Sequence, residues 1–202
     1  VADPFDVTVI RDIIKVPSVR SRELMDGYLW LRASQFQRDT GLEAIATLAK
    51  AQAEGPLKGV VIDLRYNPGG VLGASVDMAG AVLDGGLVVY TEGRHPQAAD
   101  QYEAAAGDML NGAPIVVLIN GGSASASEIV AGALQDRRRA VIMGTRSFGK
   151  GSVQTILPVN DTRAVKLTTA LYYTPNGRSI QAEGIVPDIV VERAEVTSVE
   201  SN

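Results

Sequence analysis

The stretch Pro114-Ile-Val-Val-Leu-Ile119-Asn-Gly-Gly-Ser123-Ala-Ser125-Ala-Ser127-Glu-Ile129 decides the fold of this 202-residue chain. Its first six residues form an apolar run of strand length, which is typical of a strand buried on both faces of a parallel sheet. Three serines at alternate positions follow, and a helical pattern then continues to about Gln135. The stretch therefore predicts a strand, a sharp turn and a helix, with hydroxyl groups concentrated in the turn.

The same succession is repeated on either side of this stretch. Gly59–Leu64 is a second apolar run, which ends in the turn Arg65-Tyr-Asn-Pro-Gly-Gly70 before a helix that begins at about Leu72. Ala140–Met143 is a third strand, and it leads into the loop Gly144–Lys150. Strands that alternate with helices predict an α/β fold with a mostly parallel sheet and flanking helices. Active sites of such folds form at the carboxyl ends of the strands, so we expect these three turns to lie together.

The remaining pattern completes one domain of residues 1–202. Further strands are predicted at Phe5–Ile14, Gly27–Leu31, Leu87–Tyr90 and Gly184–Val191, with a carboxyl-terminal β-hairpin formed by Val153–Leu157 and Ala164–Tyr172. A helix is predicted to begin at the capping box Thr40-Gly-Leu-Glu43, to turn Leu42, Ile45, Leu48, Ala49 and Ala53 inward, and to end at Gly55-Pro56. The polar segment Thr91–Gly112 is predicted to contain a helix in its second half.

Composition and charge exclude several classes of function. Hydrophobic residues make up 46% and charged residues 21% of the chain, as in ordinary soluble globular proteins, and the net charge of −4 argues against nucleic acid as a partner. The absence of cysteine excludes a thiol nucleophile, and a single histidine, His95, excludes a multi-histidine metal site. We expect no metal and no cofactor. No apolar run approaches the roughly 20 residues of a membrane-spanning helix.

The serine-rich turn offers a nucleophile at the start of a helix. Free N–H groups and the positive end of the helix dipole favour a developing oxyanion there. However, Ser125-Ala-Ser-Glu128 is also a capping box, and Ser125 on this interpretation merely caps the helix. The spacing alone does not rank Ser123, Ser125 and Ser127 as nucleophiles.

Lys150 is the candidate general base. It lies between two glycines, beside Phe148 and shortly before Val153, which predicts an apolar and desolvated surrounding. An ammonium group removed from water gives up its proton more readily and then serves as a base. A surface loop lysine is the plainer alternative, and a Ser-His-Asp triad would have to use His95. A phosphate-binding loop is disfavoured because Gly151 occupies the position of its Ser or Thr.

Three blocks of the sequence together resemble the carboxyl-terminal processing proteases, also called tail-specific proteases, a serine peptidase family with a Ser-Lys dyad. The blocks are Asp63-Leu-Arg-Tyr-Asn-Pro-Gly-Gly70, Gly122-Ser-Ala-Ser-Ala-Ser-Glu-Ile129 and Gly144-Thr-Arg-Ser-Phe-Gly-Lys-Gly-Ser-Val-Gln154. Gly184-Ile-Val-Pro-Asp188 resembles the closing motif of the family. The resemblance covers roughly residues 5–192 and implies a core related to the Clp protease and crotonase folds.

The resemblance also implies roles for individual residues. Ser125 corresponds to the nucleophile and Lys150 to the general base, and Gln154 corresponds to a glutamine that orients the lysine amine. The amide of Ala126, with that of Gly69 or Gly70, corresponds to the oxyanion hole. Asp136 matches an aspartate of the motif without a settled role, and an exposed carboxylate at the end of the helix explains it equally well.

The sequence departs from the family in one respect, because nothing in it resembles the PDZ domain or the amino-terminal helical segment. The opening Val1-Ala-Asp-Pro4 carries no signal-peptide pattern, and we expect a shortened or matured chain. The expected substrates are proteins or peptides with apolar carboxyl termini, and a homo-oligomer is left open. The expected location is the bacterial periplasm or another extracytoplasmic compartment, with the thylakoid lumen of chloroplasts as the alternative.

Two other functions remain as alternatives to an active endopeptidase. A chain without its PDZ domain would be a catalytically impaired, protease-like binding module. The third hypothesis is a crotonase-type enzyme that acts on acyl-CoA, although the sequence indicates no basic pocket that favours it.

Overall fold

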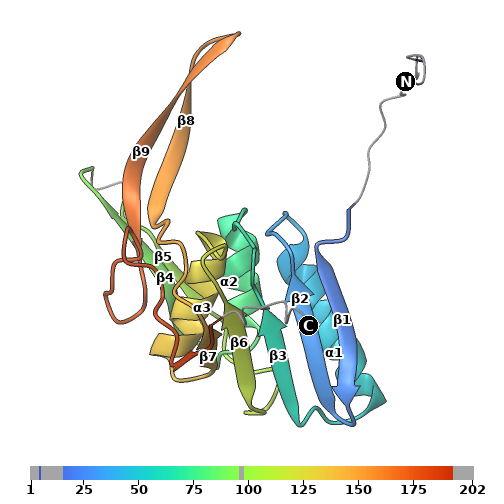
Figure 1. The fold of residues 1–202 in the computed structure, drawn as a ribbon. Helices are drawn as coiled ribbons and strands as arrows, with labels where there is room; N and C mark the ends of the chain where they lie inside the picture. Colours follow the sequence, from blue (N-terminus) through green and yellow to red (C-terminus); the bar gives the residue numbers. More distant parts are fainter. Residues whose placement is uncertain (1–4, 6–15, 96–97, 193–202) are drawn as a thin grey trace, which may run out of the picture.

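A largely parallel sheet of six strands forms the centre of the molecule, which confirms the predicted α/β class (Figure 1). The computed structural model describes residues 5, 16–95 and 98–192. In spatial order the strands are β1 (Val19–Met25), β2 (Tyr28–Ala33), β3 (Gly59–Asp63), β6 (Ile115–Ile119), β7 (Val141–Gly144) and β10 (Ile189–Val190). β1 runs antiparallel to β2, and the other neighbouring pairs are parallel.

A second, antiparallel sheet contains four strands. In spatial order they are β5 (Gln101–Ala104), β4 (Gly86–Gly93), β9 (Arg163–Tyr173) and β8 (Ser152–Asn160). β8 and β9 form the predicted hairpin, which projects beyond the rest of the molecule (Figure 1, orange).

Three helices pack side by side against the six-stranded sheet: α1 (Thr40–Glu54), α2 (Leu72–Gly80) and α3 (Ala126–Asp136). α3 also contacts β4 of the second sheet, and every residue from Ala126 to Leu134 is buried. Small side chains allow this enclosure, since a Cβ atom on Gly132 would lie 2.7 Å from the Thr174 side chain. α3 is therefore enclosed along most of its length.

Several predicted elements differ from the structure. Of the predicted strand Phe5–Ile14, all but Phe5 lies outside the described residues. β1 was not predicted, because its residues alternate only weakly and nearly all are exposed at the edge of the sheet. The prediction of a helix in the second half of Thr91–Gly112 is wrong, because this segment forms strand β5. The last strand is shorter than Gly184–Val191.

The predicted start and inner face of α1 also need correction. The N-cap is Asp39, without a side-chain cap, and Glu43 instead accepts a hydrogen bond from Ser18 Oγ at 2.9 Å. Leu42 is 60% exposed, whereas Gly41, Ala44 and Leu48 are buried. The close approach to α2 explains this rotation, because a Cβ atom on Gly41 would lie 2.6 Å from the carbonyl oxygen of Ala74.

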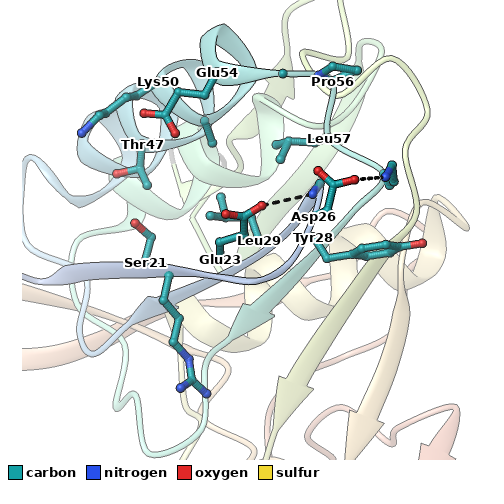
Figure 2. Close-up of a pocket in the computed structure, with 15 residues that line it drawn as sticks. Ser21, Glu23, Asp26, Tyr28, Leu29, Thr47, Lys50, Glu54, Pro56 and Leu57 are labelled. Atoms are coloured by element: carbon teal, nitrogen blue, oxygen red, sulfur yellow. Dashed lines mark hydrogen bonds and ion pairs between the residues drawn. The ribbon is translucent and has the colours of Figure 1, made fainter.

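A cavity of about 620 Å³ lies between the β1–β2 turn and the end of α1 (Figure 2). An ion pair of 2.5 Å between Lys58 and Asp26 closes one side, and Glu23 accepts a hydrogen bond from Gly27 N–H at 3.2 Å. The cavity is at the amino ends of β2 and β3, opposite to the edge where parallel sheets form active sites. Among the described residues the longest helix, α1, has 15 residues, and no helix meets the requirements of a membrane span.

Candidate active site

The three predicted turns meet at the carboxyl edge of the sheet. They follow β3, β6 and β7, which are neighbours in the sheet. Ala124 N–H donates to the carbonyl of Asn67 at 3.0 Å, and Phe148 N–H donates to the carbonyl of Ser123 at 3.0 Å. The prediction that the turns lie together is therefore confirmed.

Two of the three serines serve to join these turns. Ser123 and Ser127 are completely buried. Ser123 Oγ donates to the carbonyl of Leu64 at 2.8 Å, and Ser127 Oγ donates to the carbonyl of Asn67 at 2.9 Å. Both hydroxyl protons are thus engaged by the backbone of the turn that follows β3, and neither group faces solvent.

Ser125 is in a different environment. It is partly exposed and occupies the N-cap position of α3, with φ of 55° and ψ of −113°. A positive φ is uncommon for a residue other than glycine, and such a conformation costs on the order of 1–3 kcal/mol unless the surroundings enforce it. The predicted capping box with Glu128 is also present, and Ser125 N–H donates to Glu128 Oε2 at 2.7 Å. Helix capping and an accessible position at the turn therefore occur together in this residue.

The glycines after Asn67 lie directly against Ser125. A Cβ atom on Gly69 would lie 2.8 Å from Ser125 Cβ and 2.9 Å from the nitrogen of Ala126, so only glycine permits this approach. Gly69 N–H already donates to Asn67 Oδ1 at 2.9 Å. The N–H groups of Gly70 and Ala126 have no hydrogen-bond acceptor within the described part of the chain. Of the two glycines, Gly70 is therefore the one with a free donor.

Asn67 belongs to the predicted turn, but the sequence did not indicate the role of its side chain. Its side chain is buried, with Nδ2 donating to the carbonyl of Ala33 at 2.9 Å and Oδ1 accepting from Gly69. It thereby fixes the glycine turn against the end of β2. The only sequence signal was its place before Pro68 and two glycines, which is typical of any tight turn.

Lys150 does not lie in the desolvated pocket that the sequence predicted. Its side chain is exposed, and Phe148, expected to cover it, is itself 68% exposed. The prediction was wrong because Gly149 and Gly151 provide no cover, and Val153 packs against the core instead. The backbone of Lys150 is nevertheless well held, since its N–H donates to Glu128 Oε2 at 2.8 Å.

Gln154 lies on β8, four residues after Lys150, and is exposed. It is paired with Thr168 of β9 next to an irregularity in the strand register. Among the described residues, its side chain forms no hydrogen bond with Lys150. The structure thus brings the Ser125 and Lys150 backbones together, but it does not join Gln154 to the lysine.

Asp136 is not an exposed carboxylate at a helix end. Its side chain is only 3% exposed, forms an ion pair with Arg178 and accepts a hydrogen bond from Asn176 N–H at 2.8 Å. It therefore ties the end of α3 to the turn after β9. Because Asp136 is 11 positions after Ser125, it is about 16 Å along the helix from Ser125. Its position indicates a structural anchor.

Asp63, at the end of β3, holds the beginning of the turn that contains the glycines. Its buried carboxylate accepts hydrogen bonds from Arg65 at 2.7 and 2.9 Å and from Arg32 at 3.3 Å. Burial alone would raise the pKa of Asp63, but the hydrogen bonds from the side chain and backbone of Arg65, and the charges of Arg65 and Arg32, outweigh it. The pKa is therefore held below its ordinary value.

Replacing Asp63 by Asn should destabilise the fold by about 2–3 kcal/mol at pH 7, because two partly buried arginines lose their counter-charge. The lowered pKa gives stability that is present above the unfolded value of about 3.9 and is lost as pH falls through the folded value. The difference between the two proteins should therefore shrink in acid. Urea unfolding at pH 7 and near pH 3 measures this, with Asp26→Asn in the exposed Lys58 pair as a control. Equal stability of Asp63→Asn and wild type at pH 7 would contradict the prediction.

Comparisons with known proteins identify the family of the chain. Residues 27–191 match the sequence pattern of Peptidase family S41. The chain is 54% identical over 194 residues to a carboxy-terminal-processing protease of Bartonella bacilliformis, covering 94% of this chain and 44% of that protein. It is 39% identical over 207 residues to a carboxyl-terminal-processing protease of Synechocystis sp., covering 96% and 47%.

A solved structure shows the same fold. The photosystem II D1 C-terminal processing protease superimposes with a TM-score of 0.79 at 33% identity, over 89% of this chain and 49% of that chain. The chain spans about half the length of the curated relatives it matches. On the strength of the match to residues 27–191, the chain belongs to peptidase family S41.

Proposed function

We propose that residues 1–202 are the protease core of a serine endopeptidase that cleaves protein substrates near their carboxyl termini. Ser125 is the nucleophile in this proposal. The observation that carries it is the contrast among the serines: the hydroxyls of Ser123 and Ser127 are buried and engaged, while Ser125 is accessible. Ser125 also lies next to the free N–H group of Ala126, which is where an oxyanion would form.

In the proposed reaction, Ser125 Oγ attacks the carbonyl carbon of the scissile peptide bond and transfers its proton to the neutral amine of Lys150. The N–H groups of Gly70 and Ala126 stabilise the resulting oxyanion. The carbon–nitrogen bond then breaks, and Lys150 gives its proton to the leaving amine, which leaves an acyl-enzyme ester on Ser125. Water attacks the ester while Lys150 accepts its proton, and this proton finally returns to Ser125 Oγ.

In the proposed reaction, Gln154 orients the amine of Lys150. The side chain of Lys150 is exposed and makes no hydrogen bond with Gln154 in the structure. A bound peptide must therefore cover both side chains before Gln154 can orient the amine. Exclusion of water favours the neutral amine and strengthens the hydrogen bonds around it. Gln154 and Lys150 lie on consecutive parts of the same segment, at the base of the β8–β9 hairpin, where a peptide can contact both.

The substrates proposed are proteins or peptides with apolar carboxyl termini, and the similarity to carboxyl-terminal-processing proteases supports the carboxyl-terminal position of the cut. An extracytoplasmic location, either the bacterial periplasm or the thylakoid lumen, belongs to the same proposal.

Cleavage of a defined peptide tests the function. A peptide with three apolar residues at its carboxyl terminus should be cut near that end, and at least about tenfold faster than the same peptide ending in aspartates, which is a modest discrimination of about 1.4 kcal/mol. Mass spectrometry of the products locates the cut. Binding of the apolar peptide without any product would refute the endopeptidase and favour a binding module.

A further inference from the structure

Glu128 is a completely buried acid whose partners are all neutral. Oε2 accepts hydrogen bonds from Ser125 N–H at 2.7 Å and Lys150 N–H at 2.8 Å. Oε1 accepts hydrogen bonds from Ser147 Oγ at 2.5 Å and Gly149 N–H at 2.6 Å. Burying a carboxylate costs several kcal/mol, and four donors together with the amino end of α3 offset this cost.

One oxygen atom of Glu128 therefore joins the two residues of the proposed dyad. Because both bonds end on Oε2, the backbone nitrogens of Ser125 and Lys150 can be no further apart than the two bond lengths together. The residues are 25 positions apart in the sequence and are separated by α3 and β7. The contact through Glu128 therefore fixes the position of the loop Gly144–Lys150 (the lysine loop) relative to the nucleophile.

Helix capping alone does not account for this arrangement. Of the four hydrogen bonds that Glu128 accepts, a capping box needs only the one donated by the N–H group of the N-cap residue. Three of the four donors come instead from the lysine loop, at Ser147, Gly149 and Lys150. The charge of Glu128 is thus directed mainly at the loop that carries the proposed base.

A third segment braces the same loop from its other side. Ser147 Oγ, which donates to Glu128, accepts a hydrogen bond from Ile185 N–H at 2.6 Å. Ala182 N–H donates to the carbonyl of Gly149 at 2.9 Å. A Cβ atom on Gly184 would lie 2.7 Å from the carbonyl oxygen of Ser147, so the contact is close. The lysine loop is consequently held between Glu128 and this segment.

We propose that Glu128 is a positioning residue for the dyad. The carboxylate fixes the start of α3 and the loop of Lys150 in one relative placement, from which the lysine side chain reaches Ser125 Oγ. Glu128 is completely buried and does not touch substrate. This inference rests on the proposed function, because it assumes that Ser125 and Lys150 act together.

Replacing Glu128 by Gln tests the inference. The amide keeps the size of the side chain, but its NH₂ group faces two N–H or O–H donors that it cannot accept. We expect kcat to fall by about 100-fold or more, as for a displacement of roughly 1 Å in a catalytic group, while KM changes less than about threefold. Glu54→Gln, at an exposed glutamate on the end of α1 (Figure 2), is the matched control and should leave both constants unchanged.

Two further variants separate the failure of this inference from that of the proposed function. Ser125→Ala and Lys150→Ala should be inactive in the same assay. If either retains activity, the dyad and the inference are both overturned. If both are inactive and Glu128→Gln has a wild-type kcat, only the role of Glu128 is overturned.

Amide hydrogen exchange of the wild-type protein tests the same contacts without relying on a variant that folds. The N–H groups of Gly149 and Lys150 lie in a loop, where exchange is ordinarily fast unless a hydrogen bond protects them. We expect their exchange to be at least about 100-fold slower than in an unstructured peptide. Unprotected exchange at both positions in the folded protein would refute the inference.

Discussion

Replacing Ser125 by alanine should lower kcat/KM by about 10⁴-fold or more, the loss expected when a serine nucleophile is removed. Stability should fall by no more than about 1 kcal/mol, the usual contribution of an N-cap side chain, because the hydrogen bond from Ser125 N–H to Glu128 and the burial around α3 remain. Cleavage of the apolar peptide and urea unfolding measure the two effects separately.

The same change at Ser123 or Ser127 should have the reverse effect. Each hydroxyl is the buried donor to a carbonyl group of the neighbouring turn, and its loss should cost about 1–3 kcal/mol of folding free energy. The chemistry should survive in both variants, with kcat/KM within about tenfold of wild type, because neither group reaches the substrate. Activity that survives in Ser125→Ala but disappears in Ser123→Ala or Ser127→Ala would assign the nucleophile elsewhere.

Sequence patterns predicted the centre of the fold well, because its strands are buried on both faces. The apolar runs of β3 and β6 are short and rich in Val and Ile, which favours strands over buried helices, and the turns and helices after them follow from glycine and serine positions. Edge strands gave no such signal. Val19–Met25 and Gln101–Ala104 are strands through backbone pairing, while their side chains face mostly water.

The inner face of α1 could not be predicted for a related reason. The helix contains several alanines, which are spread around it. The hydrophobicity of its faces therefore differs little in the sequence pattern. Its orientation is decided by the contact of Gly41 with α2, which sequence periodicity does not describe.

The candidate site was located by sequence, but its internal order was not. Ser123, Ser125 and Ser127 are equivalent in spacing, and they are distinguished only by carbonyl groups of Leu64 and Asn67, about 60 residues earlier. Glu128 was interpreted as a capping residue, which accounts for one of its four hydrogen bonds. The partners that give it a larger role are 19–22 residues later.

The prediction about the surroundings of Lys150 failed because neighbours in sequence were taken as neighbours in space. Phe148 turns to solvent, and the groups that hold the loop are backbone amides facing Glu128. The loop is therefore ordered by hydrogen bonds, and the lysine side chain remains free to approach the nucleophile. This distinction determines how Lys150 should respond to mutation.

Replacing Lys150 by Ala or by Arg should in both cases lower kcat by about 10³-fold or more. The arginine variant is the informative one. It keeps the positive charge and the backbone bond to Glu128, but a guanidinium stays protonated in proteins and cannot accept the proton of Ser125. Lys166→Ala, at an exposed lysine on the β8–β9 hairpin, should retain wild-type kcat and serves as the control.

The pH dependence of the wild-type protein provides the complementary test. A neutral amine is required as the base, so kcat/KM should rise as the pH is raised from mildly acidic to alkaline. Loss of stability does not produce this rise, since the lowered pKa of Asp63 affects folding only in acid. A flat profile over this range, or an arginine variant with nearly wild-type kcat, would show that Lys150 contributes charge and does not act as the base.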